Sequence, residues 1–314
     1  MRAIAVSEYG ATPAPMNLPR PEPRPGEILV KMIAAGLNPL DWKVADGMLK
    51  DSADAEFPLI LGRDGAGVVD EVGEGVTRLR HGEQVYGCFL DVERGTGSFA
   101  EYAVVPEDGP VARMPDGMIY TQAAAVPTAG TTALTMMETA GVAEGQAVLV
   151  VGATGGVGQA LVQLAAREGA KVIATARADM AGTMRRLGAD ETVDHTAGDL
   201  NRQVLEVHSD GIDAVLDVVS DTGATEGIAQ LLRPGGVYVS TTWSVNPDAM
   251  EAQGLRGVNV EVEPSAELLD RLSELIDAGE LRVSIEREVP LEDAPDALAG
   301  NRAGGARGKT VIRV

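Results

Sequence analysis

Hydrophobic positions follow two different patterns along the chain, and the change between them lies near residue 120. Before it, short apolar runs alternate with turns that contain Pro or Gly, and the clearest runs are residues 26–36, 65–73, 83–90 and 98–106. Short apolar runs bounded by such turns are typical of β-strands, and several at close spacing indicate a barrel-like unit. After it comes a stretch rich in small residues, 121–141, whose apolar spacing is helical.

From residue 146 onward, predicted strands alternate with predicted helices. Uniformly apolar strands are predicted at residues 147–152, 170–176, 212–219 and 237–242. Helical patterns lie at residues 157–169, 180–190, 225–236 and 265–279. Apolar strands that alternate with amphipathic helices predict a parallel sheet covered on both faces. The segments 281–291 and 308–314 are strand-like again.

These patterns predict an α/β protein with two domains, which a length of 314 residues accommodates. We expect a β-rich domain built from residues 1–119 and 285–314. It encloses a nucleotide-binding domain with a doubly wound parallel sheet, residues 120–284.

The composition of the chain indicates which kinds of partner to exclude and which cell compartment to expect. The formal net charge is −21, which opposes binding to a phosphate backbone and argues against a nucleic-acid partner. No apolar run is long enough to span a membrane. Cys88 is the single cysteine, so no disulfide forms within the chain. We expect a cytoplasmic protein, with no membrane partner, in which Cys88 is a small core residue.

The segment "VLVVGATGGVGQALVQLA" joins an apolar strand to an amphipathic helix through a glycine-rich turn. Gly152, Gly155 and Gly158 have the spacing Gly-x-x-Gly-x-x-Gly, and Gly156 lies between the last two. A dinucleotide pyrophosphate needs a tight turn, bare backbone and free N–H groups at a helix N-terminus. In this strand–turn–helix context the segment predicts a dinucleotide-binding site.

The end of the next strand distinguishes NAD from NADP. An acid at this position binds the ribose 2′-hydroxyl in NAD-binding domains. Here the chain has Ala176 and Arg177, followed by Arg185, Arg186 and His195. A guanidinium group matches the geometry of a phosphate, so we expect NADP(H). The alternative is that Arg177 is a solvated residue at the start of a helix.

Seven segments together resemble a known family. They are "AAGLNPLDWKVADG", "FPLILGRDGAGVVDEVGEGV", "GSFAEYAVVP", "AAAVPTAGTTAL", "VLVVGATGGVG", "RRLGADETVDH" and "RGKTVIRV". In this order they resemble the zinc-independent, zeta-crystallin-like quinone oxidoreductase branch of the medium-chain dehydrogenase/reductase superfamily. The resemblance implies a GroES-like catalytic domain, a Rossmann domain, NADPH bound in the cleft between them, and commonly a homodimer. It also implies hydride transfer to a small-molecule substrate, either a quinone or the C=C bond of an α,β-unsaturated carbonyl.

The resemblance also suggests which residues form the site. It implies that Asn38 lies near the nicotinamide and the substrate. Matching positions imply cofactor contacts from a larger set, Thr128, Gly130, Thr131, Gly155, Gly156, Val157 and His195. We further expect Gly152, Thr154, Arg177, Val219 and Thr241 to contact NADPH. Many relatives have Lys where this chain has Met180, and several quinone reductases have an aromatic residue where it has Lys43.

A catalytic zinc is not expected. Zinc-dependent relatives have Cys and His at the positions of Asn38 and Arg63, and zinc needs three protein ligands. His81, His195 and His208 lie in separate segments. We interpret Arg63 as a structural ion-pair residue that pairs with Asp64 or Glu101.

Charge develops on an acceptor oxygen during hydride transfer, so hydrogen-bond donors aimed at that oxygen lower the barrier. Asn38 is the predicted neutral donor, and Lys43 is a cationic donor or, alternatively, a solvated helix residue. Trp42 and Trp243 are expected to line the substrate pocket, although Trp42 also suits ordinary packing. Asp41 is expected to cap the helix that follows it. An enoyl-thioester reductase and a non-catalytic NADPH-binding or sensing protein remain alternative functions.

Overall fold

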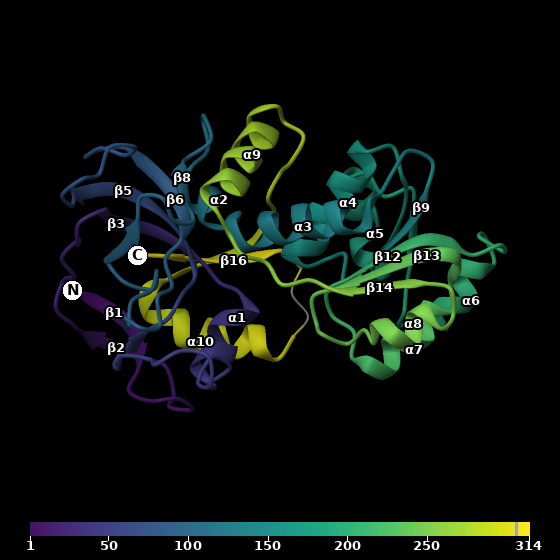
Figure 1. Ribbon diagram of the computed structural model, residues 1–314, viewed down its shortest axis with the longest axis horizontal. Helices are drawn as coiled ribbons and strands as arrows, with labels where there is room; N and C mark the ends of the chain where they lie inside the picture. Colours follow the sequence, from purple (N-terminus) through teal and green to yellow (C-terminus); the bar gives the residue numbers. More distant parts are fainter. Residues whose placement is uncertain (305–306) are drawn as a thin grey trace. The chain divides into compact units, whose positions relative to one another are not determined.

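The computed structural model describes residues 1–304 and 307–314. Contacts divide the chain into two units. The first contains residues 1–131, 264–279 and 283–314, and the second contains residues 132–263 and 280–282. Both termini lie in the first unit (Figure 1). None of the helices in these described ranges is long and apolar enough to cross a membrane.

The first unit is rich in β-structure, as the sequence predicts. Its strands are β1 (Arg2–Val6), β2 (Ala14–Asn17), β3 (Glu27–Gly36), β4 (Leu59–Ile60), β5 (Asp64–Val72), β6 (Gln84–Cys88), β7 (Tyr102–Pro106), β8 (Val111–Arg113), β15 (Ile285–Pro290) and β16 (Lys309–Arg313). Seven of them form the sheet β15-β16-β3-β5-β6-β8, with β7 paired to β3. β3 pairs antiparallel with both β5 and β16, so strands from the two ends of the chain meet in one sheet.

Short helices surround this sheet. They are α1 (Pro39–Ala45), α2 (Tyr120–Ala124), α9 (Ala266–Asp277), α10 (Ala294–Arg302) and the 3-10 turn η1 (Leu291–Asp293). α3 (Pro127–Ala140) begins in the first unit and ends in the second. The helical stretch predicted at residues 121–141 is split, because α2 ends at Ala124 and a new helix, α3, begins at Pro127.

The second unit is a six-stranded parallel sheet with helices on both faces, as predicted. Its strands are β9 (Ala147–Val151), β10 (Lys171–Thr175), β11 (Glu191–Val193), β12 (Ile212–Asp217), β13 (Leu232–Ser240) and β14 (Arg256–Asn259), in the order β11-β10-β9-β12-β13-β14. Its helices are α4 (Gly156–Arg167), α5 (Ala178–Arg186), α6 (Leu200–Leu205), α7 (Thr222–Ala229) and α8 (Pro247–Glu251). α4 lies on one face, and α7 and α8 lie on the other (Figure 1).

The order of these strands defines where a ligand binds. The chain moves outward from β9 to β11, then returns to the other side of β9 and moves outward from β12 to β14. The direction therefore reverses between β9 and β12. In open parallel sheets, ligands bind outside the carboxyl ends of the strands at this reversal. All-buried side chains of β9 explain why its sequence shows no alternation.

Two details differ from the predicted pattern. The helix predicted at residues 225–236 ends at Ala229, and β13 starts at Leu232, which pairs with Ile212. Pro234, Gly235 and Gly236 cannot extend a stable helix, so this part of the chain joins the sheet through a bulge instead.

The contact boundaries also differ from the predicted boundaries at residues 120 and 284. The sequence placed α9 in the nucleotide-binding domain, whereas its contacts assign it to the first unit. The reason is visible in its hydrogen bonds. The hydroxyl group of Tyr86 donates to the carbonyl oxygen of Leu269 at 2.6 Å, and the amide of Asp116 donates to the carboxylate of Asp277 at 2.9 Å.

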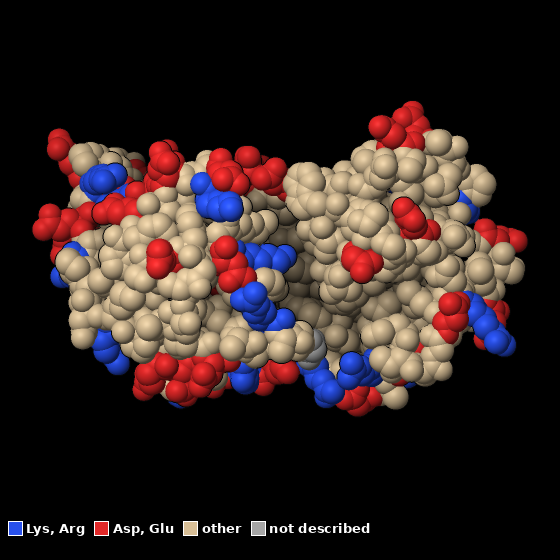
Figure 2. All heavy atoms as spheres, turned by 90° about the horizontal axis from the view of Figure 1, so that it is seen from below, with Lys and Arg blue, Asp and Glu red and all other residues tan. Residues whose placement is uncertain are grey.

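Acidic side chains are spread over the face of each unit that Figure 2 shows, in line with the net charge of −21.

Candidate active site

The loop after β3 holds Asn38 in a fixed backbone conformation. Asn38 is the N-cap of α1 and has an extended backbone, with φ −128° and ψ 154°. Its N–H donates to the carboxylate of Asp41 at 2.8 Å. Asp41 is the third residue of the helix, so this bond is the reciprocal half of a capping box. The side chain of Asp41 therefore caps a helix, as predicted, but the predicted helix start is wrong, because α1 begins at Pro39 and Asn38 is its N-cap.

Asp41 is fully buried and both of its carboxylate oxygens accept backbone N–H groups. The second bond comes from the amide of Arg63 at 3.0 Å. The pKa of Asp41 is raised from 3.8 to about 7, mainly by burial. The bond from Asn38, the charge of Lys309 and the bond from Arg63 lower this pKa, and repulsion by Asp64 raises it. A carboxyl group that changes its charge near neutral pH therefore lies beside the N-cap residue of α1.

Lys309 is a functional candidate that the sequence reading missed. It is 5% exposed, at the first position of β16. Its ammonium donates to the carbonyl oxygen of Leu37 at 3.1 Å and to the side-chain oxygen of Asn38 at 2.6 Å, and it lies 3.5 Å from a carboxylate oxygen of Asp64. The available signal was one lysine at the start of the terminal strand "KTVIRV", two residues before the apolar pair Val311 and Ile312. A charge in such a strand needs a partner in the protein interior.

Asp64 connects this group to the start of α3. Its carboxylate is fully buried and accepts both the N–H of Thr128, at 3.1 Å, and the hydroxyl group of Thr128, at 2.6 Å. Thr128 is a predicted cofactor contact, and its hydroxyl proton is already engaged in this bond. The predicted neighbours Gly130 and Thr131 follow in the same helix. A Cβ at Gly130 would lie 2.8 Å from Leu272, and the buried hydroxyl group of Thr131 donates to the carbonyl oxygen of Pro127 at 2.7 Å.

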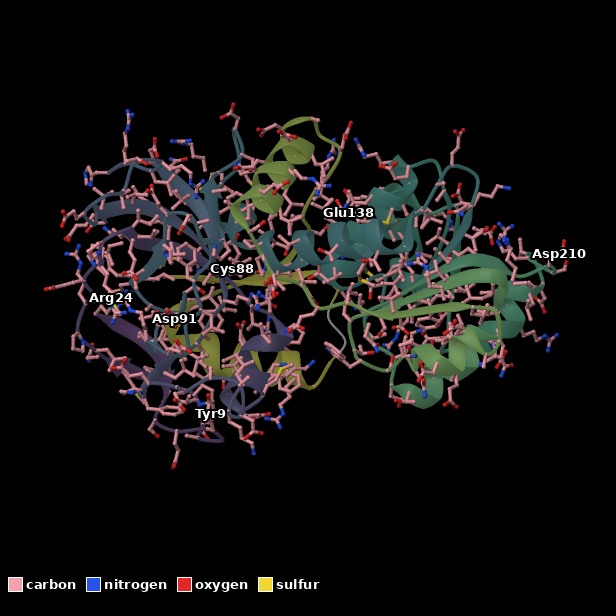
Figure 3. The ribbon with its side chains drawn as sticks, in the orientation of Figure 1. Tyr9, Arg24, Cys88, Asp91, Glu138 and Asp210 are labelled. Carbon is pink, nitrogen blue, oxygen red and sulfur yellow. The ribbon has the colours of Figure 1, made fainter. Side chains whose placement is uncertain are left out.

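Cys88 lies at the edge of the same buried cluster, inside the β-rich unit (Figure 3). Its thiol contacts a carboxylate oxygen of Asp64 at 3.7 Å. Burial raises the pKa of this thiol to about 12, and the charge of Asp64 adds to the shift. The thiol is therefore protonated at neutral pH and is a poor nucleophile. The prediction that Cys88 is a small core residue is confirmed.

Lys43 and Trp42 lie on α1 and contact each other. The ammonium of Lys43 is 5.7 Å from the centre of the Trp42 ring, and the Lys43 side chain is exposed. The indole N–H of Trp42 donates to the side-chain oxygen of Asn301 at 3.1 Å, and Arg302 lies over the same ring. Trp42 therefore has packing partners within the first unit. The roles of Lys43 in catalysis and of Trp42 in the substrate pocket stay predictions.

The sheet of the second unit brings most of the predicted cofactor contacts to one edge. Gly152 follows β9, Arg177 follows β10, His195 follows β11, Val219 follows β12, and Thr241 follows β13. All five strands are parallel, so the carboxyl ends of the strands face the same side. This is the edge at which the strand order predicts a ligand.

The glycine-rich turn leaves no room for larger side chains at two positions. Gly152 has φ +82°, and a Cβ there would lie 2.7 Å from Val218 and 2.8 Å from Val219. A Cβ at Gly158 would lie 2.2 Å from the carbonyl oxygen of Gly152. The first turn of α4 therefore packs directly on the turn that starts it, with Gly155 as its N-cap. Thr154 lies in this turn, and Gly156 and Val157 are the first residues of α4, where the N–H groups of the helix start suit a pyrophosphate.

A cation and an anion, Arg177 and Asp194, lie near the start of the helix that follows β10. Arg177 is exposed at the N-cap of α5, and its guanidinium group has no hydrogen bond or ion pair within residues 1–304 and 307–314. Asp194 accepts the N–H of Ala178, the next residue, at 3.2 Å. Bonds from Thr196 hold the pKa of Asp194 below its usual range. The sequence reading did not identify this carboxylate, which lies at the helix start beside the predicted phosphate ligand.

The basic cluster predicted around Arg177 is only partly free. The guanidinium group of Arg185 donates to the hydroxyl group of Thr192 at 3.2 Å, and that of Arg186 donates to the hydroxyl group of Thr183 at 2.9 Å. Both groups therefore already have hydrogen-bond partners within the protein. His195 is exposed. Arg177 is therefore the cation of this group that is best placed to bind a phosphate.

Two exposed apolar side chains follow β12 and β13. Val219 and Trp243 are each 62% exposed. Trp243 has φ +59°, a left-handed conformation that is unfavourable for a bulky residue. An exposed, strained aromatic residue at the ligand edge of a parallel sheet is consistent with a binding role, and its place in the substrate pocket stays a prediction.

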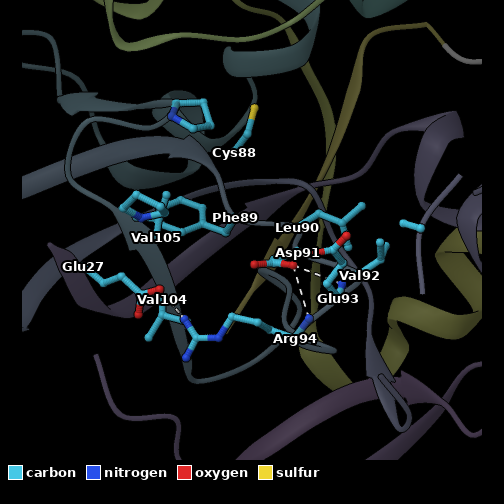
Figure 4. A pocket seen from close by; sticks show the side chains of 13 residues that line it. Glu27, Cys88, Phe89, Leu90, Asp91, Val92, Glu93, Arg94, Val104 and Val105 are labelled. Carbon is cyan, nitrogen blue, oxygen red and sulfur yellow. Dashed lines mark hydrogen bonds and ion pairs between the residues drawn. The ribbon is translucent and has the colours of Figure 1, made fainter. Parts of the chain in front are cut away.

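A cavity of about 320 Å³ lies elsewhere in the first unit (Figure 4). Phe89, Val92, Val104 and Val105 line its apolar part. The polar groups on its walls have partners, because Arg94 pairs with Glu27 at 2.6 Å and Asp91 accepts the N–H groups of Glu93 and Arg94. None of the predicted site residues lines this cavity.

The interpretation of Arg63 is wrong as to its partner. Glu101 pairs with Arg2 instead, at 3.0 Å. The guanidinium Nε of Arg63 is buried and has no hydrogen-bond partner in the described part of the chain. Among the same residues no group of three or more His, Cys, Asp or Glu side chains could hold a metal ion.

Comparisons with known proteins identify the relatives of this chain. Residues 24–116 match the alcohol dehydrogenase GroES-like domain family, and residues 187–312 match the zinc-binding dehydrogenase family. A 2-methylene-furan-3-one reductase from Solanum lycopersicum is 33% identical, over 99% of this chain and 79% of the relative.

Solved structures show the same fold across the whole chain. The quinone oxidoreductase of Coxiella burnetii matches with a TM-score of 0.88 and 30% identity, over 100% of this chain and 99% of the other. A mycobacterial protein solved in complex with NADPH matches with a TM-score of 0.87 and 27% identity, over 100% of both chains.

Proposed function

Because the chain belongs to the quinone oxidoreductase branch of the medium-chain dehydrogenase/reductase superfamily, we propose that it reduces quinones, or the C=C bond of α,β-unsaturated carbonyls, with NADPH. The observation that carries the proposal is the position of Asn38. Its backbone is fixed by Asp41 and its side-chain oxygen by Lys309, which leaves the amide NH₂ group as an oriented donor. An oriented neutral donor suits an acceptor oxygen that becomes negative during the reaction.

NADPH is the hydride donor in this enzyme, and it supplies the hydride when bound. The residues of the second unit fit such a dinucleotide. The Gly152–Gly158 turn offers bare backbone and N–H groups to the pyrophosphate, and Arg177 offers a free guanidinium group to the 2′-phosphate. Val219, Thr241 and His195 follow neighbouring strands at the same edge and are proposed to line the rest of the cofactor.

In the proposed reaction the protein binds the acceptor with its oxygen against the Asn38 amide. The N–H group stabilises the negative charge that develops on that oxygen as the acceptor carbon gains the hydride. A solvent proton then completes the reduction. Lys43 and Trp42 are proposed to border the acceptor from α1.

We further propose that no zinc takes part and that the enzyme is a cytoplasmic homodimer. Asn38 and Arg63 occupy positions where the resemblance places zinc ligands in other branches, and a guanidinium group is a poor neighbour for a metal cation. The second unit ends in the strand β14, whose outer edge could pair with a second copy. Unchanged activity after chelation, and a mass of two chains by light scattering, would support these two points.

The test of function is NADPH oxidation with a panel of acceptors, namely 1,4-benzoquinone, 9,10-phenanthrenequinone, 2-alkenals and crotonyl-CoA. We expect turnover of quinones or alkenals. Turnover of crotonyl-CoA alone would indicate an enoyl-thioester reductase. NADPH binding without turnover of any acceptor would indicate a binding protein and contradict the proposal.

Asn38→Ala removes the proposed donor. Loss of one such donor lowers kcat by about 100-fold in comparable sites, so we expect a fall of this order with unchanged NADPH affinity. Asn17→Ala, at an exposed position of β2 in the same unit, is the matched control. An unchanged kcat in Asn38→Ala would return Asn38 to a purely structural role.

A further inference from the structure

The ammonium group of Lys309 has an acceptor for each of its three protons. These acceptors are the carbonyl oxygen of Leu37, the side-chain oxygen of Asn38 and a carboxylate oxygen of Asp64. The shortest of the three distances, 2.6 Å, is the one to Asn38. Lysine has no acceptor atom, so only the oxygen of the Asn38 amide can face it. The contact therefore selects one of the two orientations of that amide.

The position of the ammonium group is itself fixed. Lys309 begins β16, and the next residues of β16 pair with the end of β3, where Ile312 lies opposite Ala35. Asn38 is the second residue after β3. The fully buried carboxylate of Asp64, at the start of β5, is the counter-charge, and β5 pairs with the other side of β3. Three paired strands therefore hold the amide, the cation and the anion in one place.

The remaining donor of the Asn38 amide points away from the cation. Its NH₂ group makes one long bond, to the carbonyl oxygen of Gly36 at 3.3 Å. The second N–H of that group has no bond among the described residues. A cation bound at an amide oxygen withdraws electron density from the amide and makes its N–H groups better donors.

From this geometry we propose that Lys309 is a positioning residue that orients and polarises the Asn38 amide, so that its free N–H stabilises the negative oxygen of the reduced acceptor. The proposal rests on the proposed reductase function. Lys309 does not touch the substrate in this scheme, and its effect on the rate passes through Asn38 alone.

A double-mutant cycle tests this dependence. We expect Lys309→Met to lower kcat by about 10-fold or more, with NADPH affinity unchanged. In the Asn38→Ala background the same substitution should change kcat by less than about 2-fold, because the group it positions is absent. Lys31→Met, at an exposed position of β3, is the matched control and should have the wild-type kcat. Equal effects of Lys309→Met in both backgrounds would overturn the proposal.

Lys309→Met leaves the carboxylate of Asp64 without its cation, and this variant could therefore fail to fold. In that event the cycle is repeated in an Asp64→Asn background, in which Lys309→Met leaves no carboxylate without its cation. The double variant Lys309→Met/Asp64→Asn is then compared with Asp64→Asn alone. The expected effects of Lys309→Met on kcat are the same as before, about 10-fold or more with Asn38 present and less than about 2-fold in Asn38→Ala.

A second readout does not depend on turnover. The side-chain NH₂ resonances of Asn38, assigned by their loss in Asn38→Ala, should shift in Lys309→Met and stay in place in Lys31→Met. Unshifted resonances would overturn the proposal even in an active enzyme. A wild-type protein that reduces no acceptor would contradict the proposed function, and in that case shifted resonances would still support the contact between Lys309 and Asn38.

Discussion

The buried carboxyl group of Asp41 makes the stability of the first unit depend on pH in a direction that can be measured. Its pKa is about 7 in the folded protein, against 3.8 for the free group. Burial is the main cause, and Asp64 and Lys309 are the two charged side chains that act on it, in opposite directions. Because the folded state holds the proton more tightly, the group contributes stability at low pH, and this contribution is lost as the pH rises toward 7.

The magnitude follows from the two pKa values. Between pH 5 and pH 8 the unfolded chain has this carboxyl group ionised throughout, while the folded protein must release the proton. The free energy of unfolding should therefore fall by about 2.5 kcal/mol over this range through Asp41 alone. The asparagine of Asp41→Asn does not titrate, so the difference in stability between wild type and variant should change by the same amount.

Urea unfolding at pH 5, 6, 7 and 8 measures this difference. Because the two units need not unfold together, the probe must report the unfolding of the first unit alone. The chain has two tryptophans, Trp42 in the first unit and Trp243 in the second. In a Trp243→Phe background, fluorescence reports the first unit through Trp42. Asp51→Asn, an exposed substitution in the same unit, should track the wild type at every pH.

The refuting result is a difference between wild type and Asp41→Asn that stays constant from pH 5 to pH 8. Such a result would mean that the two backbone N–H bonds and the charge of Lys309 balance the effect of burial. Asp41 would then be ionised throughout, and no group beside Asn38 would titrate near neutral pH.

Two further predictions concern the second unit. Arg177→Glu should lower kcat/KM for NADPH by about 100-fold and leave the value for NADH within a few-fold, because a guanidinium group without a partner among the described residues is replaced by a carboxylate, which repels the phosphate. Arg202→Glu is the exposed control, and equal losses with both cofactors would contradict the assignment. Gly158→Ala should destabilise the protein by about 1–3 kcal/mol and weaken NADPH binding, because its Cβ would lie 2.2 Å from a carbonyl oxygen. Gly155→Ala, whose Cβ would lie at an ordinary 3.6 Å, should keep the wild-type Tm, and a Tm for Gly158→Ala equal to that of Gly155→Ala would refute the steric argument.

The parts of the fold that depend on local pattern could be predicted from the sequence. Buried parallel strands such as β9 are uniformly apolar, and the glycine-rich turn after it is specific in its context. The capping role of Asp41 could also be predicted, because the residues involved lie within three positions of each other. The start of β13 could not, since its first residues look like the end of a helix and join the sheet only by pairing with β12.

The buried cluster around Asn38 could not be predicted for a different reason. Asn38, Asp64 and Lys309 are far apart in the sequence, and only the pairing of β3 with β5 and β16 brings them together. No periodicity within one segment carries that information. The membership of α9 in the first unit has the same origin, because it depends on contacts with Tyr86 and Asp116 that are more than 150 residues away.

The cluster also bears on which acceptors the proposed enzyme can reduce. In zinc-dependent relatives the resemblance places a metal ligand at the position of Asn38, and a metal there binds the substrate oxygen directly as a Lewis acid. Here the cation is the buried ammonium group of Lys309, which contacts the Asn38 amide and which we propose to act on the substrate only through it. A hydrogen bond from a polarised amide stabilises less charge than a directly bound metal ion does. Such a site suits quinones and enones, whose conjugation already spreads the negative charge produced by hydride transfer, and it does not suit simple ketones.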